Sequence, residues 1–247
     1  MHKRFAGLPV DFWFVGRESG GFSERLAPGV GDKNLLSLVA SSGAATATCM
    51  RVTADQSVVT ADHLSGGLTI PAVALITNQL GQALLLRAAD CLPIVFYTTT
   101  TKPVLALIHG GRRELDADII ARTICQLKDQ YDIAPEQLHA YLGPSIESAS
   151  YRLPTEVVAG LYHPSWTPHI VHTHGQIRLD LFGFARGELI RNGVRAEQIT
   201  ESPTDTATDQ RYYSYYATTR HDAPAGMNGC QVRMPIKTTT HHTTIDA

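Results

Sequence analysis

Residues 87–111 read RAADCLPIVFYTTTTKPVLALIHGG, and this stretch says most about the fold. Two apolar runs, LPIVFY and PVLALI, flank a short polar segment, which is the pattern of two antiparallel strands joined by a five-residue loop. A cysteine precedes the first run and a histidine follows the second. If Tyr97 faces Pro103, the constant index sum of a hairpin also sets Cys91 opposite His109, with Cβ atoms about 4.5–5.5 Å apart. The sequence therefore predicts a thiol and an imidazole together at the open end of a hairpin.

The residues next to this pair suit an anion. Asp90 precedes the cysteine, and two glycines and two arginines follow the histidine: Gly110, Gly111, Arg112 and Arg113. Glycines let backbone N–H groups approach a phosphate, and a guanidinium can hold it with two hydrogen bonds. Arginine at a helix start opposes the helix dipole, which favours a functional role over a merely solvated helix start.

Three interpretations of Cys91 and His109 are open at this point. In the first, Cys91 is a buried small thiol and His109 is a strand-end histidine bonded to the backbone. In the second, the two residues are ligands of a zinc site, which needs at least a third protein ligand. In the third interpretation the imidazole activates the thiol as a nucleophile. The flanking glycines and arginines argue against a purely structural pair.

The rest of the chain mixes helices and strands without the strict alternation of a parallel sheet. The segments AVALIT and QALLLR flank a turn at Asn78 to Gly81 and predict a second hairpin. Further strands are expected at 11–15, 138–142 and 211–216, and helices at 115–131, 154–162 and 179–191. We therefore predict an α/β (α+β-like) fold, with one mixed sheet flanked by helices. A single domain is expected over residues 1–247, with its core at about 12–235 and a mobile tail at 236–247.

Composition narrows the class of protein. The 247 residues are 43% hydrophobic and 18% charged, with a formal net charge of −2, as in ordinary globular proteins. This near-neutral net charge predicts no overall electrostatic attraction to nucleic acid or to an anionic membrane. No apolar run reaches the roughly 20 residues of a membrane helix. The four cysteines form no CxxC pair and do not resemble a secreted disulfide framework. We expect a cytoplasmic protein with reduced thiols, a monomer by default.

The motifs around Cys91 and His109 resemble those of a family first described as multicopper polyphenol oxidase, or laccase-domain protein. The family is now understood as zinc-dependent purine nucleoside phosphorylases that also deaminate adenosine. Its core pattern is T-A-D-C-L-P, two apolar strands, then H-A-G-W-R-G; this chain has AADCLP at 88–93 and HGGRRE at 109–114. Weaker similarities keep the same order along the chain: GGFS at 20–23, LGPSI at 142–146, LDL at 179–181 and YSY at 213–215.

The resemblance implies an activity and a set of site residues. Phosphate would attack the anomeric carbon of adenosine or inosine to give free base and ribose 1-phosphate, with adenosine deamination as a possible second reaction. Cys91 and His109 would ligate zinc and act in catalysis, and Asp90 would orient the histidine from behind. Arg113 would contact phosphate, together with Arg112, Gly110 and Gly111. The expected partners are a purine nucleoside and phosphate.

Departures from the pattern mark a divergent member, with activity weakened or lost. The family's third zinc ligand is the histidine of Q-V-H-G, and Thr53 occupies that position here. Threonine is a poor zinc ligand, so His63 is the candidate substitute, provided that its loop folds over the site. A metal-free Cys–His hydrolase or deamidase, and a non-catalytic purine- or phosphate-binding protein, are the alternatives.

The sequence favours zinc over copper as the metal. No group of histidines has the spacing of copper ligands. His163, His169, His172 and His174 lie in a loop-like segment, where we expect them to be solvated.

Overall fold

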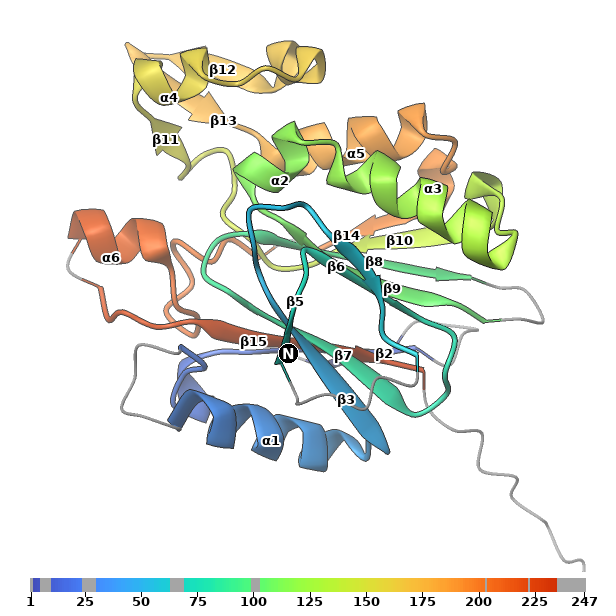
Figure 1. Cartoon of the computed structure of the whole chain (residues 1–247). Coiled ribbons are helices and arrows are strands. Elements are labelled where there is room, and N and C mark those ends of the chain that lie inside the picture. The colour runs from blue at the N-terminus through green and yellow to red at the C-terminus, as the bar shows by residue number, and fades with distance from the viewer. Residues whose placement is uncertain are drawn as a thin grey trace, which may run out of the picture.

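The computed structural model of the chain describes residues 2–4, 10–23, 30–62, 69–98, 103–202, 204–221 and 223–234. Its main body has four layers, in the order helix, sheet, sheet, helices (Figure 1). The predicted mixed α/β class is confirmed, with the described strands divided among three sheets. The expected tail at 236–247 and His63 lie outside the described residues.

The first six-stranded sheet contains the first and the last of the described strands. Its strands, in spatial order, are β1 (His2–Arg4), β2 (Asp11–Val15), β15 (Asn228–Arg233), β7 (Gln82–Ala88), β3 (Thr46–Arg51) and β5 (Thr69–Pro71). The pairs from β1 to β7 are antiparallel, and β3 is parallel to both of its neighbours. Helix α1 (Val30–Ser42) covers the outer face of this sheet (Figure 1).

The second six-stranded sheet contains the stretch that carries the family motifs. Its strands, in spatial order, are β14 (Ile199–Glu201), β10 (Leu138–Leu142), β8 (Leu92–Thr98), β9 (Leu105–Gly110), β6 (Ala74–Thr77) and β4 (Val58–Thr60). The three central pairs are antiparallel and the two edge pairs are parallel. Helices α2 (Arg112–Asp116), α3 (Ile119–Tyr131) and α5 (Leu181–Arg191) cover its outer face (Figure 1).

A small antiparallel sheet extends from the helical side of the body. It consists of β11 (Arg152–Leu153), β13 (Gln176–Leu179) and β12 (Ile170–Thr173), with α4 (Thr155–Ala159) beside it (Figure 1). The remaining helices are α6 (Tyr215–His221) and the short 3-10 turns η1 (Arg17–Ser19), η2 (Pro135–Gln137), η3 (Pro164–His169) and η4 (Ala196–Gln198). Among the described helices, none combines the length and apolar character needed to cross a bilayer.

Burial of both sheet faces explains the continuous apolar runs in the sequence. On β9, Leu107 belongs to the core between the two sheets, whereas Ile108 packs under the helices. On β7, Leu84 faces the second sheet and Leu85 faces α1. A strand that is buried on both faces shows no apolar–polar alternation, which is why periodicity alone could not reveal the second sheet.

Two predicted elements are wrong. The segments around Asn78 to Gly81 form β6 and β7, but these strands belong to different sheets and are not a hairpin. The backbone of the turn between them is hydrogen-bonded to other segments of the chain. The Gly81 N–H donates to the Met234 carbonyl, and the Gly81 carbonyl accepts from the Ala45 N–H. The expected strand at 211–216 is instead a turn that leads into α6, so its tyrosines act from a loop and a helix start.

Candidate functional site

Cys91 and His109 lie on the same face of the second sheet, but not directly opposite each other. Tyr97 pairs with Leu105, and Pro93 pairs with His109, which gives an index sum of 202 instead of the predicted 200. The predicted register is therefore wrong by two residues. Because side chains alternate with a period of two, a shift of two leaves both side chains on the same face.

Gly111 is the residue around which the thiol and the imidazole meet. A Cβ built on Gly111 would lie 3.3 Å from Cys91 Sγ and 3.0 Å from His109 Cε1. The backbone of Gly111 is extended (φ −75°, ψ 161°), so glycine is required here by close approach and not by conformation. The predicted meeting of the thiol and the imidazole is thus present as a diagonal contact.

The pair sits at the end of the core between the two sheets. His109 shares its strand face with Leu107, which belongs to this core, and Cys91 packs against the same core. The His109 N–H donates to the Val73 carbonyl at 2.9 Å, which anchors the end of β9. His109 therefore projects from the end of β9, and Cys91 projects from the residue directly before β8.

Glu114, on α2, is the site residue that the sequence reasoning missed. Its Oε2 lies 3.5 Å from His109 Nδ1, and both side chains are about nine-tenths buried. Within the described part of the chain, His109 Nδ1 has no hydrogen-bond partner of good geometry. A signal existed, because the family pattern H-A-G-W-R-G ends in glycine where this chain has Glu114. A thiol, an imidazole and a carboxylate therefore surround Gly111.

The neighbouring charges control the protonation of His109. Burial alone would lower the pKa of His109, but Cys91 and Glu114 outweigh it and raise the pKa to about 10. Burial alone would raise the pKa of Glu114, whereas the adjacent His109 imidazole lowers it. At neutral pH these shifts favour an imidazolium beside the carboxylate.

The two arginines of the motif have different surroundings. Arg113 is exposed, as expected of a residue that meets a soluble anion. Arg112 is half-buried beside Tyr151, a residue from the loop before β11. Burial raises the pKa of Tyr151, and the Arg112 guanidinium opposes this through charge and a hydrogen bond. Gly110 pairs across the ladder with Leu92, whose carbonyl would be 2.7 Å from a Cβ at position 110.

Asp90 joins distant segments of the chain behind the cysteine. Its carboxylate accepts hydrogen bonds from Thr206 Oγ1 (2.8 Å), Ser214 Oγ (2.9 Å) and the Tyr216 N–H (2.7 Å). Burial raises the pKa of Asp90, and these hydrogen bonds act in the opposite direction. These contacts hold the 204–216 segment against the turn that carries Cys91, and the expectation that Asp90 orients His109 stays a prediction.

The fit of a zinc ion depends on donors around His109. A cysteine sulfur, a histidine nitrogen and a carboxylate oxygen are all zinc ligands, and catalytic sites use three protein ligands. Cys91, His109 with its unpartnered Nδ1, and Glu114 supply these donor types. Thr53 Oγ1, at the expected third position, donates instead to Asp55 Oδ1 at 2.5 Å.

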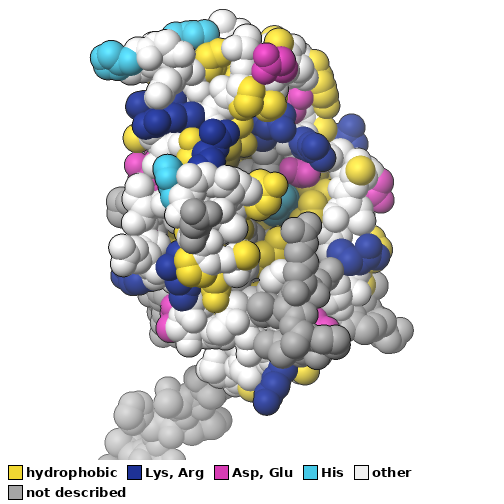
Figure 2. Space-filling view, turned by 90° about the vertical axis from the view of Figure 1, so that its left-hand side faces the viewer, with side chains coloured by type: hydrophobic (Ala, Val, Ile, Leu, Met, Phe, Trp, Pro, Cys, Tyr) yellow, Lys and Arg dark blue, Asp and Glu magenta, His cyan; other side chains and the backbone are white. Residues whose placement is uncertain are grey.

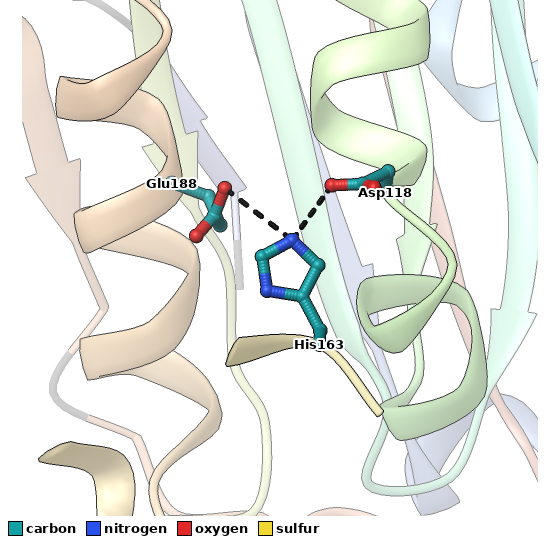
Figure 3. A group of neighbouring side chains, drawn as sticks. All are labelled: Asp118, His163 and Glu188. Atoms are coloured by element: carbon teal, nitrogen blue, oxygen red, sulfur yellow. Dashed lines mark hydrogen bonds and ion pairs between the residues drawn. The ribbon is translucent and has the colours of Figure 1, made fainter. Parts of the chain in front are cut away.

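A second cluster lies away from this site, between the helices. Asp118, His163 and Glu188 have donor atoms within 4.8 Å of one another, and Figure 3 shows the imidazole pointing between the two carboxylates. His163 Nε2 lies 2.8 Å from Asp118 Oδ1 and 4.0 Å from Glu188 Oε2. Only 9% of the His163 side chain is exposed, so the expectation that it is solvated is wrong.

The hydrogen bonding of His163 fits a structural contact between helices better than a metal site. Its Nδ1 accepts a hydrogen bond from the Ser165 N–H at 3.2 Å. An accepting Nδ1 puts the proton of the neutral ring on Nε2, the atom that a metal would need. With its proton, Nε2 donates to Asp118 and links the start of α3 to η3 and α5.

The fold and the Cys–His motif together define a family. The family model described as "Multi-copper polyphenol oxidoreductase laccase" matches residues 27–229, and the chain belongs to this family. The resemblance inferred from the sequence is confirmed.

Curated relatives carry the name purine nucleoside phosphorylase. The protein of that name from Xylella fastidiosa (strain 9a5c) is 30% identical over 146 residues, 58% of this chain and 54% of the relative. Purine nucleoside phosphorylase Cgl2154/cg2365 from Corynebacterium glutamicum is 29% identical over 163 residues, 66% of this chain and 63% of the relative. The matches thus span only somewhat over half of the length of these relatives.

Solved structures share the fold over nearly the whole chain. YlmD from Geobacillus stearothermophilus superposes with a TM-score of 0.79 at 19% identity, covering 95% of this chain and 99% of that one. Protein NMB0706 from Neisseria meningitidis gives a TM-score of 0.78 at 20% identity, covering 96% and 99%. At such low identity the similarity establishes the fold alone.

Proposed function

We propose that this chain catalyses phosphorolysis of purine nucleosides, taking adenosine or inosine and phosphate to free base and ribose 1-phosphate. The observation that carries the proposal is the meeting of Cys91, His109 and Glu114 around Gly111, next to the arginines at the start of α2. Family membership and the names of the relatives support the same activity. All four cysteines are free thiols, which supports a reducing compartment such as the cytoplasm.

Zinc is the proposed cofactor, held by Cys91 and His109, with Glu114 offering a further oxygen. When bound, zinc would act as a Lewis acid and would also make hydroxide available at neutral pH, which suits the proposed deamination of adenosine. His63 is still a possible ligand.

The chain's own residues then have separate tasks. The exposed Arg113 guanidinium binds and orients the phosphate, and it neutralises charge that grows in the transition state. Arg112 is half-buried near Tyr151, whose raised pKa it opposes, and it offers a second guanidinium beside Arg113. The Glu114 carboxylate, 3.5 Å from Nδ1, orients the His109 ring. The strand ends that carry Cys91 and His109 supply the rigidity that such positioning requires.

The test is to incubate adenosine and inosine with purified protein, phosphate and added zinc, and to separate the products by chromatography. Phosphate-dependent release of base that is lost in Cys91→Ala supports the proposal. Cys125→Ala is the matched control, because Cys125 is an exposed thiol on α3 and not one of the proposed site residues. Base release unaffected by Cys91→Ala, or no turnover beside an active relative, would contradict it.

A metal-free thiol hydrolase or deamidase is the second candidate, and Glu114 is the observation that favours it. A carboxylate that orients an imidazole next to a thiol is the arrangement of nucleophilic catalysis by cysteine. Iodoacetamide kinetics discriminate, measured in a Cys125→Ser background because Cys125 is exposed. A Cys91 that reacts no faster than a free thiol after metal removal excludes this candidate. Purine binding without turnover would instead favour a binding protein.

A further inference from the structure

A cleft of about 660 Å³ opens between the small sheet and α6. This is within the usual size range of small-molecule sites. Three of its lining residues are basic or titratable to a cation, Arg152 from β11 and Arg220 and His221 from the end of α6, and none of its described lining residues is acidic. Figure 2, which views this side of the molecule, shows Lys and Arg side chains gathered across its upper half.

The positive charge at the cleft is not neutralised within the small sheet. Arg152 pairs directly with Arg178 across the antiparallel ladder of β11 and β13. Like charges directly opposite each other destabilise a sheet. Arg178 Nε is also buried without a hydrogen-bond partner in the described part of the chain. A bound anion would offset the repulsion, so this strand pair is better suited to a loaded site than to an empty one.

The cleft adjoins the proposed catalytic residues through two tyrosines. Tyr216 lines the cleft, and its backbone N–H is bonded to Asp90, the residue before Cys91. Tyr151, next to Arg152 in sequence, meets the Tyr216 ring edge-on, with centroids 6.3 Å apart. Tyr151 lies near enough to Arg112 and Cys91 for both residues to influence its pKa. A ligand that spans these two rings would reach from the thiol to the basic cleft.

Arg220 is already oriented by one of these rings. Its guanidinium carbon lies 4.6 Å from the centroid of the Tyr216 ring, a cation–π geometry. This contact limits the rotamers of a long, exposed side chain, which reduces the entropy lost when the guanidinium binds an anion.

We propose that this cleft binds the phosphate of a purine nucleoside monophosphate, so that the site takes a nucleotide in preference to a free nucleoside. The inference rests on the proposed function, whose substrate class it narrows. The reaction would be balanced in the same way as for a nucleoside. An oxygen of inorganic phosphate forms a bond to C1′, the C1′–N9 bond breaks, and the purine leaves with that electron pair and takes up a proton. The products are free base and ribose 1,5-bisphosphate.

Equilibrium binding tests the cleft separately from turnover. Adenosine 5′-monophosphate and adenosine are titrated by calorimetry into full-length protein carrying Cys91→Ala, which prevents consumption of the ligand. We expect the monophosphate to bind at least tenfold more tightly than adenosine. Arg152→Gln and Arg220→Gln, each introduced separately, should remove most of that preference and leave adenosine affinity within about twofold. Arg122→Gln is the matched control, since Arg122 is an exposed arginine on α3 that does not line the cleft.

Thermal melting of the free variants adds a readout that a purely structural arginine would not give. Arg152→Gln should raise the melting temperature without ligand, because it removes the repulsion from Arg178, while weakening nucleotide binding. Equal affinity for the two ligands, or unchanged monophosphate affinity in both arginine variants, overturns the inference. If inorganic phosphate occupies the cleft but the protein shows no preference for the monophosphate over adenosine, the inference is also overturned.

Turnover by the wild-type protein separates the two proposals. If adenosine is phosphorolysed and the monophosphate binds no better, nucleoside phosphorolysis stands and the cleft inference fails. If the monophosphate binds tightly through Arg152 but neither compound reacts, the cleft stands and the proposed activity fails.

Discussion

Replacing Glu114 by glutamine isolates the interaction that distinguishes this site from the family pattern. The change keeps the shape of the side chain and removes a charge 3.5 Å from His109 Nδ1. An opposite charge within about 4–6 Å shifts a pKa by about 1–3 units, and this pair is close and largely buried. The pKa of His109, raised to about 10 in the native site, should therefore fall by about 2 units, equivalent to about 2.7 kcal/mol. The remaining elevation comes from Cys91.

The measurement is an NMR titration of the His109 Cε1 proton in metal-free protein, assigned with His109→Gln. Glu156→Gln, at an exposed position on α4, controls for the loss of one negative charge. A second route to the same effect is Gly111→Ala, whose Cβ would overlap Glu114 Oε2 and push that flexible carboxylate away. If the midpoint of His109 is unchanged in Glu114→Gln, the carboxylate does not hold the imidazolium and the reasoning fails.

Three further predictions concern the His109–Glu114 pair, Asp90 and Leu107. The raised pKa of His109 stabilises the folded protein below pH 6.5, and this stabilisation is lost as the pH rises toward about 10; the lowered pKa of Glu114 stabilises it above pH 4.5, and that stabilisation is lost on acidification. Thermal melts of metal-free protein should therefore show the largest contribution of this pair between pH 4.5 and 6.5, and the same pH dependence in Glu114→Gln would contradict the assignment. Asp90→Asn should destabilise by about 2 kcal/mol in urea unfolding, because an amide has one acceptor oxygen where the two carboxylate oxygens accept from Thr206, Ser214 and the Tyr216 N–H, and a loss no larger than in exposed Asp129→Asn would refute it. Leu107→Ala should cost about 2–5 kcal/mol by the same assay, because its side chain is fully buried in the apolar core between the sheets, and a cost below that of a surface substitution would place the residue outside that core.

The apolar runs and the chemistry-bearing residues could be identified from the sequence alone. The strands β8, β9 and β10, the helix α5 and the apolar face of α3 follow from local composition and spacing, because each pattern depends on residues close in the chain. The proximity of Cys91 and His109 was also predictable. It survived the register error because a shift of two residues preserves the strand face.

The pairing of strands depended on the tertiary structure. The turn at Gly81 resembles a hairpin turn, yet its backbone groups bond to Met234 and Ala45, residues far away in the sequence. With both faces of each sheet buried, the apolar pattern carries no information about which sheet receives a strand. The exposure of Cys125, beside the apolar stripe of α3, was likewise decided by how that helix sits on the sheet.

The sequence by itself determined the family, the α/β class and the thiol–imidazole pair, because these depend on motif spacing and on apolar runs that are local in the chain. The tertiary structure decided the rest of the site. It alone brings the Glu114 carboxylate to His109, ties Asp90 to Ser214 and Tyr216 across more than a hundred residues, and opens a basic cleft beside them. The Asp90 contacts and the cleft join segments that are distant in sequence, and the packing of the sheets and helices sets their separation.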